Sequence, residues 1–151
     1  MIRRATEQDV DAVVAIYERT AATMTYLPVV HTHAEHVDWF RARLDDCEGW
    51  VWDDGVVRGY MIVGGNELMH LYLDVGWTGR RIGTALLEHA KSLRPEGFTL
   101  WTFQLNEGAR RFYERHGLDA VEFGDGSGNE EGVPDVRYEW RPRARPGSRA
   151  R

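Results

Sequence analysis

Cysteine and lysine are almost missing from this sequence, which contains one of each, Cys47 and Lys91. A single cysteine cannot close an internal disulfide, and it excludes a zinc site built on several thiolates. No apolar run approaches the roughly 20 residues that a membrane-spanning helix requires. The first residues also lack the apolar segment that follows the basic end of a secretory signal. These absences predict a cytoplasmic protein with a reduced thiol.

Basic residues are outnumbered by acidic ones, since 19 Lys and Arg face 24 Asp and Glu and give a net charge of −5. Five of the arginines lie in residues 141–151, which hold no acid, so residues 1–140 carry a net charge of −10. An acidic body repels phosphates, which argues against specific nucleic-acid binding as the main function. The segment 141–151 has no apolar side chain larger than alanine. We therefore expect a single domain over 1–140 and an Arg/Pro-rich disordered tail.

Hydrophobic periodicity and turn signals predict seven strands and four helices in residues 1–140. Thr32 and Glu35 fit a capping box at the start of the second helix. The expected helices cover about 7–23, the segment after Thr32, 80–93 and 107–116; the expected strands cover 1–5, 49–53, 56–64, 67–75, 98–104, 118–123 and 136–140. This order predicts an α/β (α+β mixed) fold, in which helices cover a mixed sheet.

A phosphate-binding turn is predicted where the strand over 67–75 runs into the third helix. Residues 78–84 (TGRRIGT) place two glycines and two arginines at this junction. The first turn of a helix leaves backbone N–H groups unpaired and carries partial positive charge, so it can hold a phosphate or pyrophosphate. A tight turn with solvent-facing arginines would produce the same pattern. The sequence has neither the Gly-Lys-Ser/Thr ending of a P-loop nor a G-x-G-x-x-G dinucleotide fingerprint.

Two motifs at this spacing resemble those of the GCN5-related N-acetyltransferase (GNAT) superfamily. Residues 78–84 are similar to motif A, Q/R-x-x-G-x-G/A, with Thr78 in place of Gln or Arg and Arg81 in place of the first glycine. Residues 106–118 (NEGARRFYERHGL) are similar to motif B, N-x-x-A-x-x-F-Y-x-x-x-G-F. The resemblance covers about 1–140 and implies a mixed, mostly antiparallel sheet of about seven strands flanked by four helices. It also implies acyl transfer from acetyl-coenzyme A to an amine.

The same resemblance implies how the coenzyme would be held, with acetyl-coenzyme A as cosubstrate and no metal. N–H groups over 78–84 would hold the pyrophosphate, and the backbone of 73–75 would pair with the pantetheine arm. Asn106 would cap its helix, bond the coenzyme, or both. The implied coenzyme-binding residues are Leu73, Asp74, Val75, Thr78, Gly79, Arg80, Arg81, Ile82, Gly83, Thr84 and Asn106.

Transfer to an amine needs a proton acceptor for the ammonium and a proton donor for the departing thiolate. Glu67 falls where several family members carry a carboxylate base, and His70 competes with it for that role. Tyr113 matches the motif B tyrosine that acts as the acid. Each also has a structural interpretation: Glu67 as a polar strand end, His70 as a half-buried strand residue, and Tyr113 as part of the apolar stripe of its helix.

The expected acceptor is a small primary amine, such as an amino acid, an amino-acid-like compound or a polyamine. Tyr26 and His31 lie between the first two helices, in the loop that roofs the acceptor site in the family. His31, His33 and His36 have no obvious carboxylate framework, so no metal site is predicted. The acids that would favour an ammonium group are Asp125, Glu130, Glu131 and Asp135.

Other functions stay open at this point. The chain could acetylate protein N-termini or lysines, or it could be a non-catalytic acyl-coenzyme A-binding regulatory domain. No membrane partner and no specific nucleic-acid partner are expected, and the sequence is compatible with a homodimer.

Overall fold

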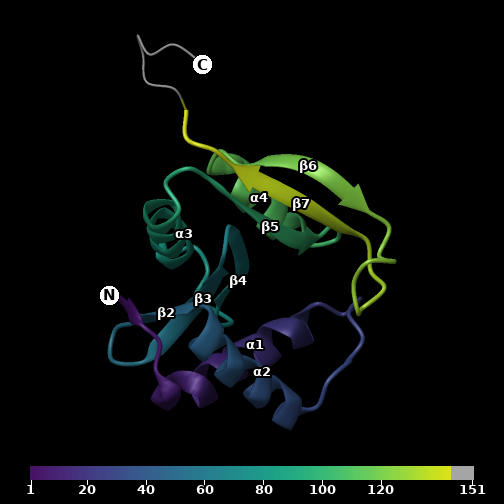
Figure 1. Cartoon of the computed structure of the whole chain (residues 1–151). Helices are drawn as coiled ribbons and strands as arrows, with labels where there is room; N and C mark the ends of the chain where they lie inside the picture. The colour runs from purple at the N-terminus through teal and green to yellow at the C-terminus, as the bar shows by residue number, and fades with distance from the viewer. Residues whose placement is uncertain (144–151) are drawn as a thin grey trace.

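One sheet of seven strands forms the centre of residues 1–143, the part of the chain that the computed structural model describes (Figure 1). The strand order is β1-β2-β3-β4-β5-β7-β6. Neighbouring strands are antiparallel except β4 and β5, which run parallel. The predicted α/β (α+β mixed) fold, with a mostly antiparallel mixed sheet and four helices, is therefore confirmed.

The element boundaries agree with the predicted ones to within a few residues. The strands are β1 (Ile2–Arg4), β2 (Glu48–Asp53), β3 (Val57–Gly64), β4 (Glu67–Leu73), β5 (Phe98–Phe103), β6 (Asp119–Gly124) and β7 (Asp135–Trp140). The helices are α1 (Val10–Thr23), α2 (His33–Asp46), α3 (Ile82–Leu93) and α4 (Glu107–Arg115), and a short 3-10 helix η1 (Glu7–Asp9) precedes α1. Within residues 1–143, none of the helices has the length and apolar character that crossing a bilayer requires. The prediction of a disordered tail falls largely on residues 144–151, which lie outside the described part.

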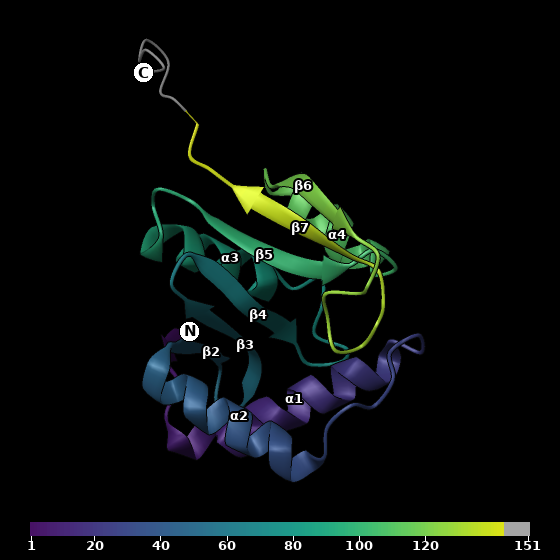
Figure 2. The ribbon, with the colours of Figure 1, turned by 45° about the vertical axis from the view of Figure 1, so that its right-hand side comes forward.

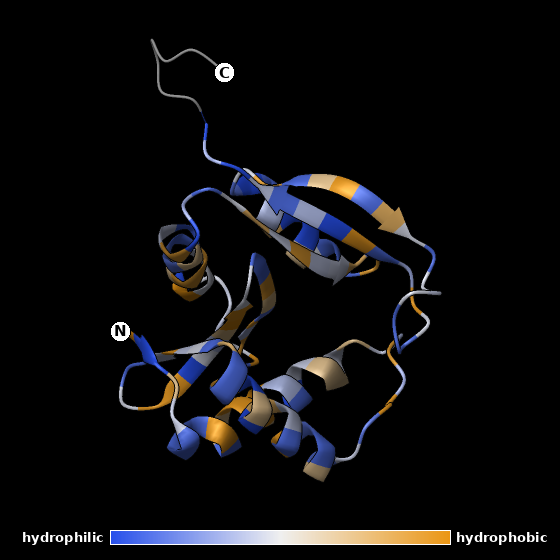
Figure 3. Ribbon diagram, viewed as in Figure 1, coloured by the Kyte–Doolittle hydropathy of each residue, from blue (hydrophilic) through white to orange (hydrophobic). Residues whose placement is uncertain are grey.

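Helices cover both faces of the sheet, α1 and α2 on one and α3 and α4 on the other. Side chains of a strand alternate between faces, and β3 is buried on both. Tyr60 and Ile62 join the core under α1 and α2, whereas Met61 and Val63 join the core under α3. Figure 3 shows the apolar residues gathered on β2–β4 and on the helices around them. This double burial explains the continuous apolar run in the sequence of β3.

Arg3 ties β1 to the start of α1 through a buried carboxylate. Its Nη1 and Nη2 donate to the two oxygens of Asp9, at 2.9 and 2.8 Å, and its Nε donates to Asp53 Oδ2 at 3.0 Å. Asp9 is buried and also accepts from the Thr6 N–H at 2.8 Å. The hydrogen bonds from Arg3 are the largest cause that holds the pKa of Asp9 below its usual value.

Replacing Asp9 by asparagine is expected to lower the free energy of unfolding by about 1.5 kcal/mol at pH 7, because charge-assisted hydrogen bonds are lost. The pKa of Asp9 is depressed in the folded state. Its contribution is therefore present above the unfolded pKa of about 3.9 and is lost as the pH falls through the folded value. Urea denaturation at pH 7 and at about pH 3 should show the difference between wild type and D9N shrinking with acid. A pH-independent difference would contradict this account.

The lone lysine of the chain connects α3 to the end of α4. Lys91 Nζ donates to the backbone oxygen of His116 at 3.0 Å and to Glu88 Oε1 at 3.2 Å. The side chain of Lys91 is 17% exposed. At the other end of α3, Thr84 Oγ1 lies 3.2 Å from His116 Nε2. These contacts fix α4 beside α3, which matters because both helices border the candidate site.

The parallel strands β4 and β5 are joined at one end only. Their ladder pair within the described residues is Glu67 with Thr99, supported by the Thr99 N–H donating to the Asn66 oxygen at 2.9 Å. A register shift opposite Ile62 inserts one extra residue, Met69, into β4. Beyond the joined end the strands separate toward their carboxyl ends (Figure 2). Backbone groups on both strands are therefore left without a sheet partner in the middle of the molecule.

Candidate active site

The separation of β4 and β5 opens a cleft of about 640 Å³ that is bordered by the starts of α3 and α4. Seven of the predicted coenzyme residues line this cleft, and so does the predicted acid, Tyr113. The seven are Leu73, Thr78, Gly79, Arg81, Gly83, Thr84 and Asn106. Asn106 also caps α4, because its Oδ1 accepts from the Ala109 N–H at 3.2 Å. The two sequence motifs thus meet across one cleft.

Four other predicted coenzyme residues do not line the cleft. The carboxylate of Asp74 accepts two hydrogen bonds from Arg19, at 2.9 and 3.0 Å. Val75 is exposed, and Ile82 is buried in the core. The guanidinium of Arg80 lies 4.4 Å from the ring of Trp77. These residues could contribute to coenzyme binding only through their backbone groups or, in the case of Arg80, through the positive charge of its side chain beside the cleft.

Arg81 takes up the backbone conformation for which motif A has a glycine. Its φ is 64° and its ψ is 8°, and it is the one non-glycine residue with positive φ among residues 1–143. A left-handed conformation costs a residue with a Cβ about 1–2 kcal/mol. Because Arg81 is the N-cap of α3, the turn keeps the path that brings the first N–H groups of the helix toward the cleft. The replacement of the motif glycine by Arg81 therefore adds a side chain and does not change the backbone shape of the turn.

A second cavity, of about 1180 Å³, meets the cleft on the side of α1 and α2. Both spaces are bordered by Met24, His70 and Tyr72, together with Trp101–Phe103 of β5. We name the second cavity the acceptor cavity after the role proposed for it below; besides the shared residues of β4 and β5, its walls come from α1, the α1–α2 loop, the start of α2 and the β6–β7 loop. Its acidic residues are Glu18, Glu122, Asp125, Glu130, Glu131 and Asp135. An acidic cavity that opens into the cleft could bind a positively charged acceptor next to an acyl donor held in the cleft.

Two loops far apart in the sequence meet at the rim of the acceptor cavity. His31 Nε2 of the α1–α2 loop lies 2.8 Å from Glu130 Oε2 of the β6–β7 loop, and Figure 1 shows the two loops side by side. The hydrogen bond with Glu130 is the largest cause that raises the pKa of His31. His33 and His36 instead contact Glu18, at 3.0 and 2.7 Å. No group of three or more His, Cys, Asp or Glu in residues 1–143 is arranged to hold a metal ion.

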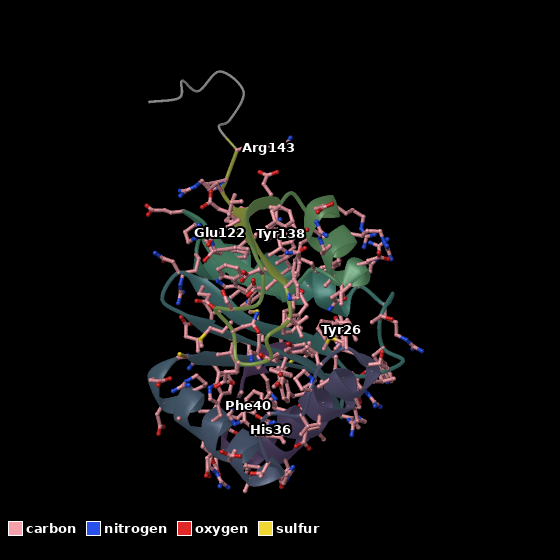
Figure 4. The ribbon with its side chains drawn as sticks, turned by 90° about the vertical axis from the view of Figure 1, so that its right-hand side faces the viewer. Tyr26, His36, Phe40, Glu122, Tyr138 and Arg143 are labelled. Atoms are coloured by element: carbon pink, nitrogen blue, oxygen red, sulfur yellow. The ribbon has the colours of Figure 1, made fainter. Side chains whose placement is uncertain are left out.

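Tyr26 lies behind the acceptor cavity and does not line it. Its ring packs edge-on against Phe103, with 6.2 Å between centroids, and its hydroxyl is buried without a hydrogen-bond partner in residues 1–143. In Figure 4 it lies between the helical layer that carries His36 and the strands that carry Glu122. Of the two predicted acceptor-site residues, His31 therefore borders the cavity, and Tyr26 supports the wall formed by β5.

Tyr113 lines the cleft although its side chain is almost fully buried. The side chain is 7% exposed and packs in the core under α3 and α4. Burial raises the pKa of Tyr113, so the hydroxyl keeps its proton. No side chain of the described residues accepts from it. A protonated, unpaired hydroxyl in a cleft can donate to a group that gains negative charge there.

Glu67 and His70 lie in very different surroundings. Glu67 begins β4 in the β3–β4 hairpin, pairs with Gly64 and Thr99, and lines neither cavity. The geometry therefore gives no support to Glu67 as the base. His70 borders both cavities, and its ring stacks on Tyr17 and Trp39 with centroids 5.5 and 4.8 Å apart. Burial lowers the pKa of His70 to about 3, so its imidazole is neutral near pH 7.

Comparison with known proteins decides the family. Residues 45–117 match the family model described as an acetyltransferase (GNAT) domain. Over 122 residues the chain is 32% identical to the peptidyl-lysine N-acetyltransferase YjaB of Escherichia coli, covering 78% of this chain and 80% of that protein. The chain belongs to the GNAT acetyltransferases.

Solved GNAT structures agree with this assignment along most of the chain. The apo form of YjaB from Escherichia coli superposes with a TM-score of 0.74 at 26% identity, covering 92% of this chain and 95% of that one. Ard1 from Thermoplasma volcanium has a TM-score of 0.74 at 18% identity, covering 93% and 96%, and that likeness shows the fold alone. The predicted resemblance, fold and enzyme class are confirmed.

GNAT enzymes use acyl-coenzyme A, and the cleft fits such a group. The turn before α3 has the left-handed residue at the glycine position of motif A, and the helix start supplies unpaired N–H groups. The guanidinium groups of Arg58 and Arg80 lie 4.0 and 4.4 Å from the Trp77 ring, so positive charge gathers at this end of an acidic protein. The separated strands offer unpaired backbone to an extended arm.

Sequence reasoning missed Tyr72 and Trp101, which both cavities share. Tyr72 follows His70 by two positions on β4, so alternation along the strand could have placed the two on one face. Trp101 is 41% exposed on β5, between the buried Leu100 and the half-buried Thr102, and this exposure depends on the fold, so the sequence alone carried no signal for it.

Proposed function

We propose that this GNAT enzyme transfers the acetyl group of acetyl-coenzyme A to the side-chain amine of lysine in peptides. The observation that carries the proposal is the acidic, aromatic acceptor cavity that opens into the coenzyme cleft at Tyr72. A lysine has a flexible apolar stem and an ammonium tip, which match aromatic walls followed by carboxylates. The relatives from Escherichia coli and Salmonella typhimurium are peptidyl-lysine N-acetyltransferases, which supports lysine over the small amine expected from the sequence.

In the proposed binding mode, the N–H groups that begin α3 hold the pyrophosphate, with Arg81 adding charge beside them. The free backbone of β4 around Leu73 pairs with the pantetheine arm. A main-chain N–H of β4 also polarises the thioester carbonyl, and a donor of this kind contributes on the order of 3–4 kcal/mol to a transition state. Asn106 borders the same arm from the start of α4.

The proposed acid is Tyr113, which lines the cleft. As the carbon–sulfur bond breaks, the hydroxyl donates to the thiolate and prevents negative charge from building up on the sulfur. The raised pKa of Tyr113 keeps that proton in place until the sulfur gains charge.

The predicted cytoplasmic location, the homodimer and the absence of a nucleic-acid partner stay predictions.

A peptide assay tests this function. The purified protein is expected to release coenzyme A thiol with acetyl-coenzyme A and an N-terminally blocked peptide that contains one lysine, and mass spectrometry should locate the acetyl group on that lysine. The same peptide with the lysine already acetylated is the control. Acetylation of a polyamine or a free amino acid, without acetylation of the peptide, would show that the acceptor is a small amine. Tight coenzyme binding with no turnover on any amine would indicate a regulatory domain.

A further inference from the structure

Two neighbouring glutamates in the β6–β7 loop have different surroundings. The carboxylate of Glu130 is held at the rim by His31 at 2.8 Å. Glu131 is half-buried and lines the acceptor cavity, and it makes no ion pair or hydrogen bond within residues 1–143. The contact between Glu130 and His31 holds the loop against the α1–α2 loop, and the next residue is thereby kept at the cavity wall.

Glu131 lies close to the tyrosines at the junction of the two cavities. Burial is the main cause that raises the pKa of Tyr17 and of Tyr72, and the carboxylate of Glu131 raises both further. Tyr72 is also within electrostatic reach of Tyr113. Glu131 lines the acceptor cavity, Tyr113 lines the cleft, and Tyr72 borders both spaces.

The other carboxylates of the acceptor cavity already have partners. Glu18 contacts His33 and His36, Glu122 contacts Arg137 at 3.2 Å, Asp125 accepts from the Ser127 N–H at 2.9 Å, and Asp135 accepts from Asn129 at 3.0 Å. A carboxylate that is already engaged gives up that contact when it takes an ammonium. Glu131 has no such contact to lose.

His70 is unsuited to take a proton although it borders the junction. Its Nδ1 lies 3.0 Å from the hydroxyl of Tyr60, which is fully buried and has no other partner among the described residues. That hydroxyl satisfies its proton by donating to Nδ1. The proton of the neutral imidazole then sits on Nε2, so His70 offers a donor to the cavity.

We infer that Glu131 is the carboxylate that receives the ammonium of the acceptor and takes its proton. This inference rests on the proposed function, and it replaces Glu67 in the role of base. Tyr17 and Tyr72 line the same cavity, and their rings suit the apolar stem of an acceptor lysine.

The step balances as follows. The ammonium gives one proton to the Glu131 carboxylate, and the freed lone pair of the nitrogen attacks the thioester carbonyl carbon. A carbon–nitrogen bond forms and the carbon–sulfur bond breaks, while Tyr113 gives its proton to the sulfur. The new amide nitrogen loses its second proton, which restores the Tyr113 hydroxyl, and Glu131 releases its proton to solvent. The products are the amide, the free thiol and one proton.

The test is the variant Glu131→Gln, which keeps the shape of the side chain and removes the proton acceptor. With a lysine peptide at pH 7, kcat/KM is expected to fall about 100-fold, within the usual range for loss of a general base. The variant needs an amine that is already neutral, so the deficit should shrink as the pH approaches the lysine pKa of about 10.4. Calorimetry should give the same affinity for acetyl-coenzyme A within about twofold. Asp119→Asn, an exposed charge removal on β6 outside both cavities, is the matched control.

Other titratable groups face the same cavity, and they are unchanged in both variants. They are Tyr17, Glu18, His31, His33, His36, His70, Tyr72, Glu122, Asp125, Glu130 and Asp135. Their titrations therefore cancel in the ratio of wild-type to variant rates, and the pH dependence of that ratio reports on Glu131.

The outcomes separate the two proposals. A deficit in E131Q that closes with rising pH, with partial recovery in Glu131→Asp, supports the inference. An active wild type whose rate and pH profile are unchanged in E131Q overturns the inference and leaves the proposed function standing. A pH-independent deficit also overturns it, because a structural loss would not depend on the protonation state of the amine. A wild type that acetylates no amine overturns the proposed function together with the inference.

Discussion

Replacing Tyr113 by phenylalanine is expected to lower kcat on the order of 100-fold while the affinity for acetyl-coenzyme A stays within about twofold. The ring is 7% exposed and fills the core under α3 and α4, so phenylalanine keeps the packing and removes the hydroxyl. Without that donor, the departing thiolate gains its charge with no proton to take from Tyr113, and loss of a general acid typically costs 10²- to 10⁴-fold. Steady-state kinetics and calorimetry on the same preparation separate the two effects.

Tyr138→Phe supplies the matched control for this experiment. Tyr138 lies in the same core, 5.8 Å from Tyr113 between ring centroids, but its hydroxyl bonds to Glu114 and Arg110 and lines neither cavity. The control should lose about 1 kcal/mol of stability and keep its kcat. Equal kcat values for wild type and Y113F would remove Tyr113 from the mechanism.

Reversing the charge of Arg81 with glutamate is expected to weaken binding of acetyl-coenzyme A about 50-fold, or 2–3 kcal/mol. The substitution exchanges a cation for an anion at the N-cap of α3, where the phosphates are proposed to bind. Each unit charge near a surface site changes the interaction by about 1 kcal/mol or more at contact distances. The loss should diminish at high salt, because ions screen exposed charges.

Arg81→Gly distinguishes the backbone from the charge. Glycine adopts the left-handed conformation without a Cβ clash. The free energy of unfolding of the variant should therefore equal that of the wild type or exceed it by up to about 1 kcal/mol, as measured by urea denaturation. Its affinity for the coenzyme should fall only a few-fold, since the N–H groups that begin α3 remain in place. Wild-type affinity in R81E would show that the phosphates bind elsewhere, and a large loss in R81G would show that the arginine side chain dominates.

Features set by neighbouring residues could be predicted from the sequence. Thr32 and Glu35 form the predicted capping box, with the Thr32 hydroxyl accepting from the Glu35 N–H at 3.2 Å. Motifs A and B likewise are short stretches of consecutive residues, and their resemblance to the family motifs located the turn before α3 and singled out Tyr113. These features depend on a few consecutive residues, and their geometry follows from local chemistry.

Features set by distant segments could not be predicted in this way. The contact between His31 and Glu130 joins residues 99 positions apart, and it links the two loops whose residues line the acceptor cavity. Glu67 has a suitable place in the sequence, but β4 and β5 are joined at its end of the strand and separate at the other. Positive φ at Arg81 is unfavourable locally and persists because the strand before it and the helix after it are both fixed by the core.

The contact between α3 and α4 has a consequence for how such an enzyme treats copies of itself. The chain has one lysine, and its ammonium is held by the His116 carbonyl and by Glu88 on a side chain that is 17% exposed. A lysine can be acetylated only when its amine is free to lose a proton and enter another active site. An acetyltransferase with this single, occupied lysine is a poor substrate for its own reaction. Under the proposed function, acetyl-lysine detected in an assay would therefore come from the acceptor peptide.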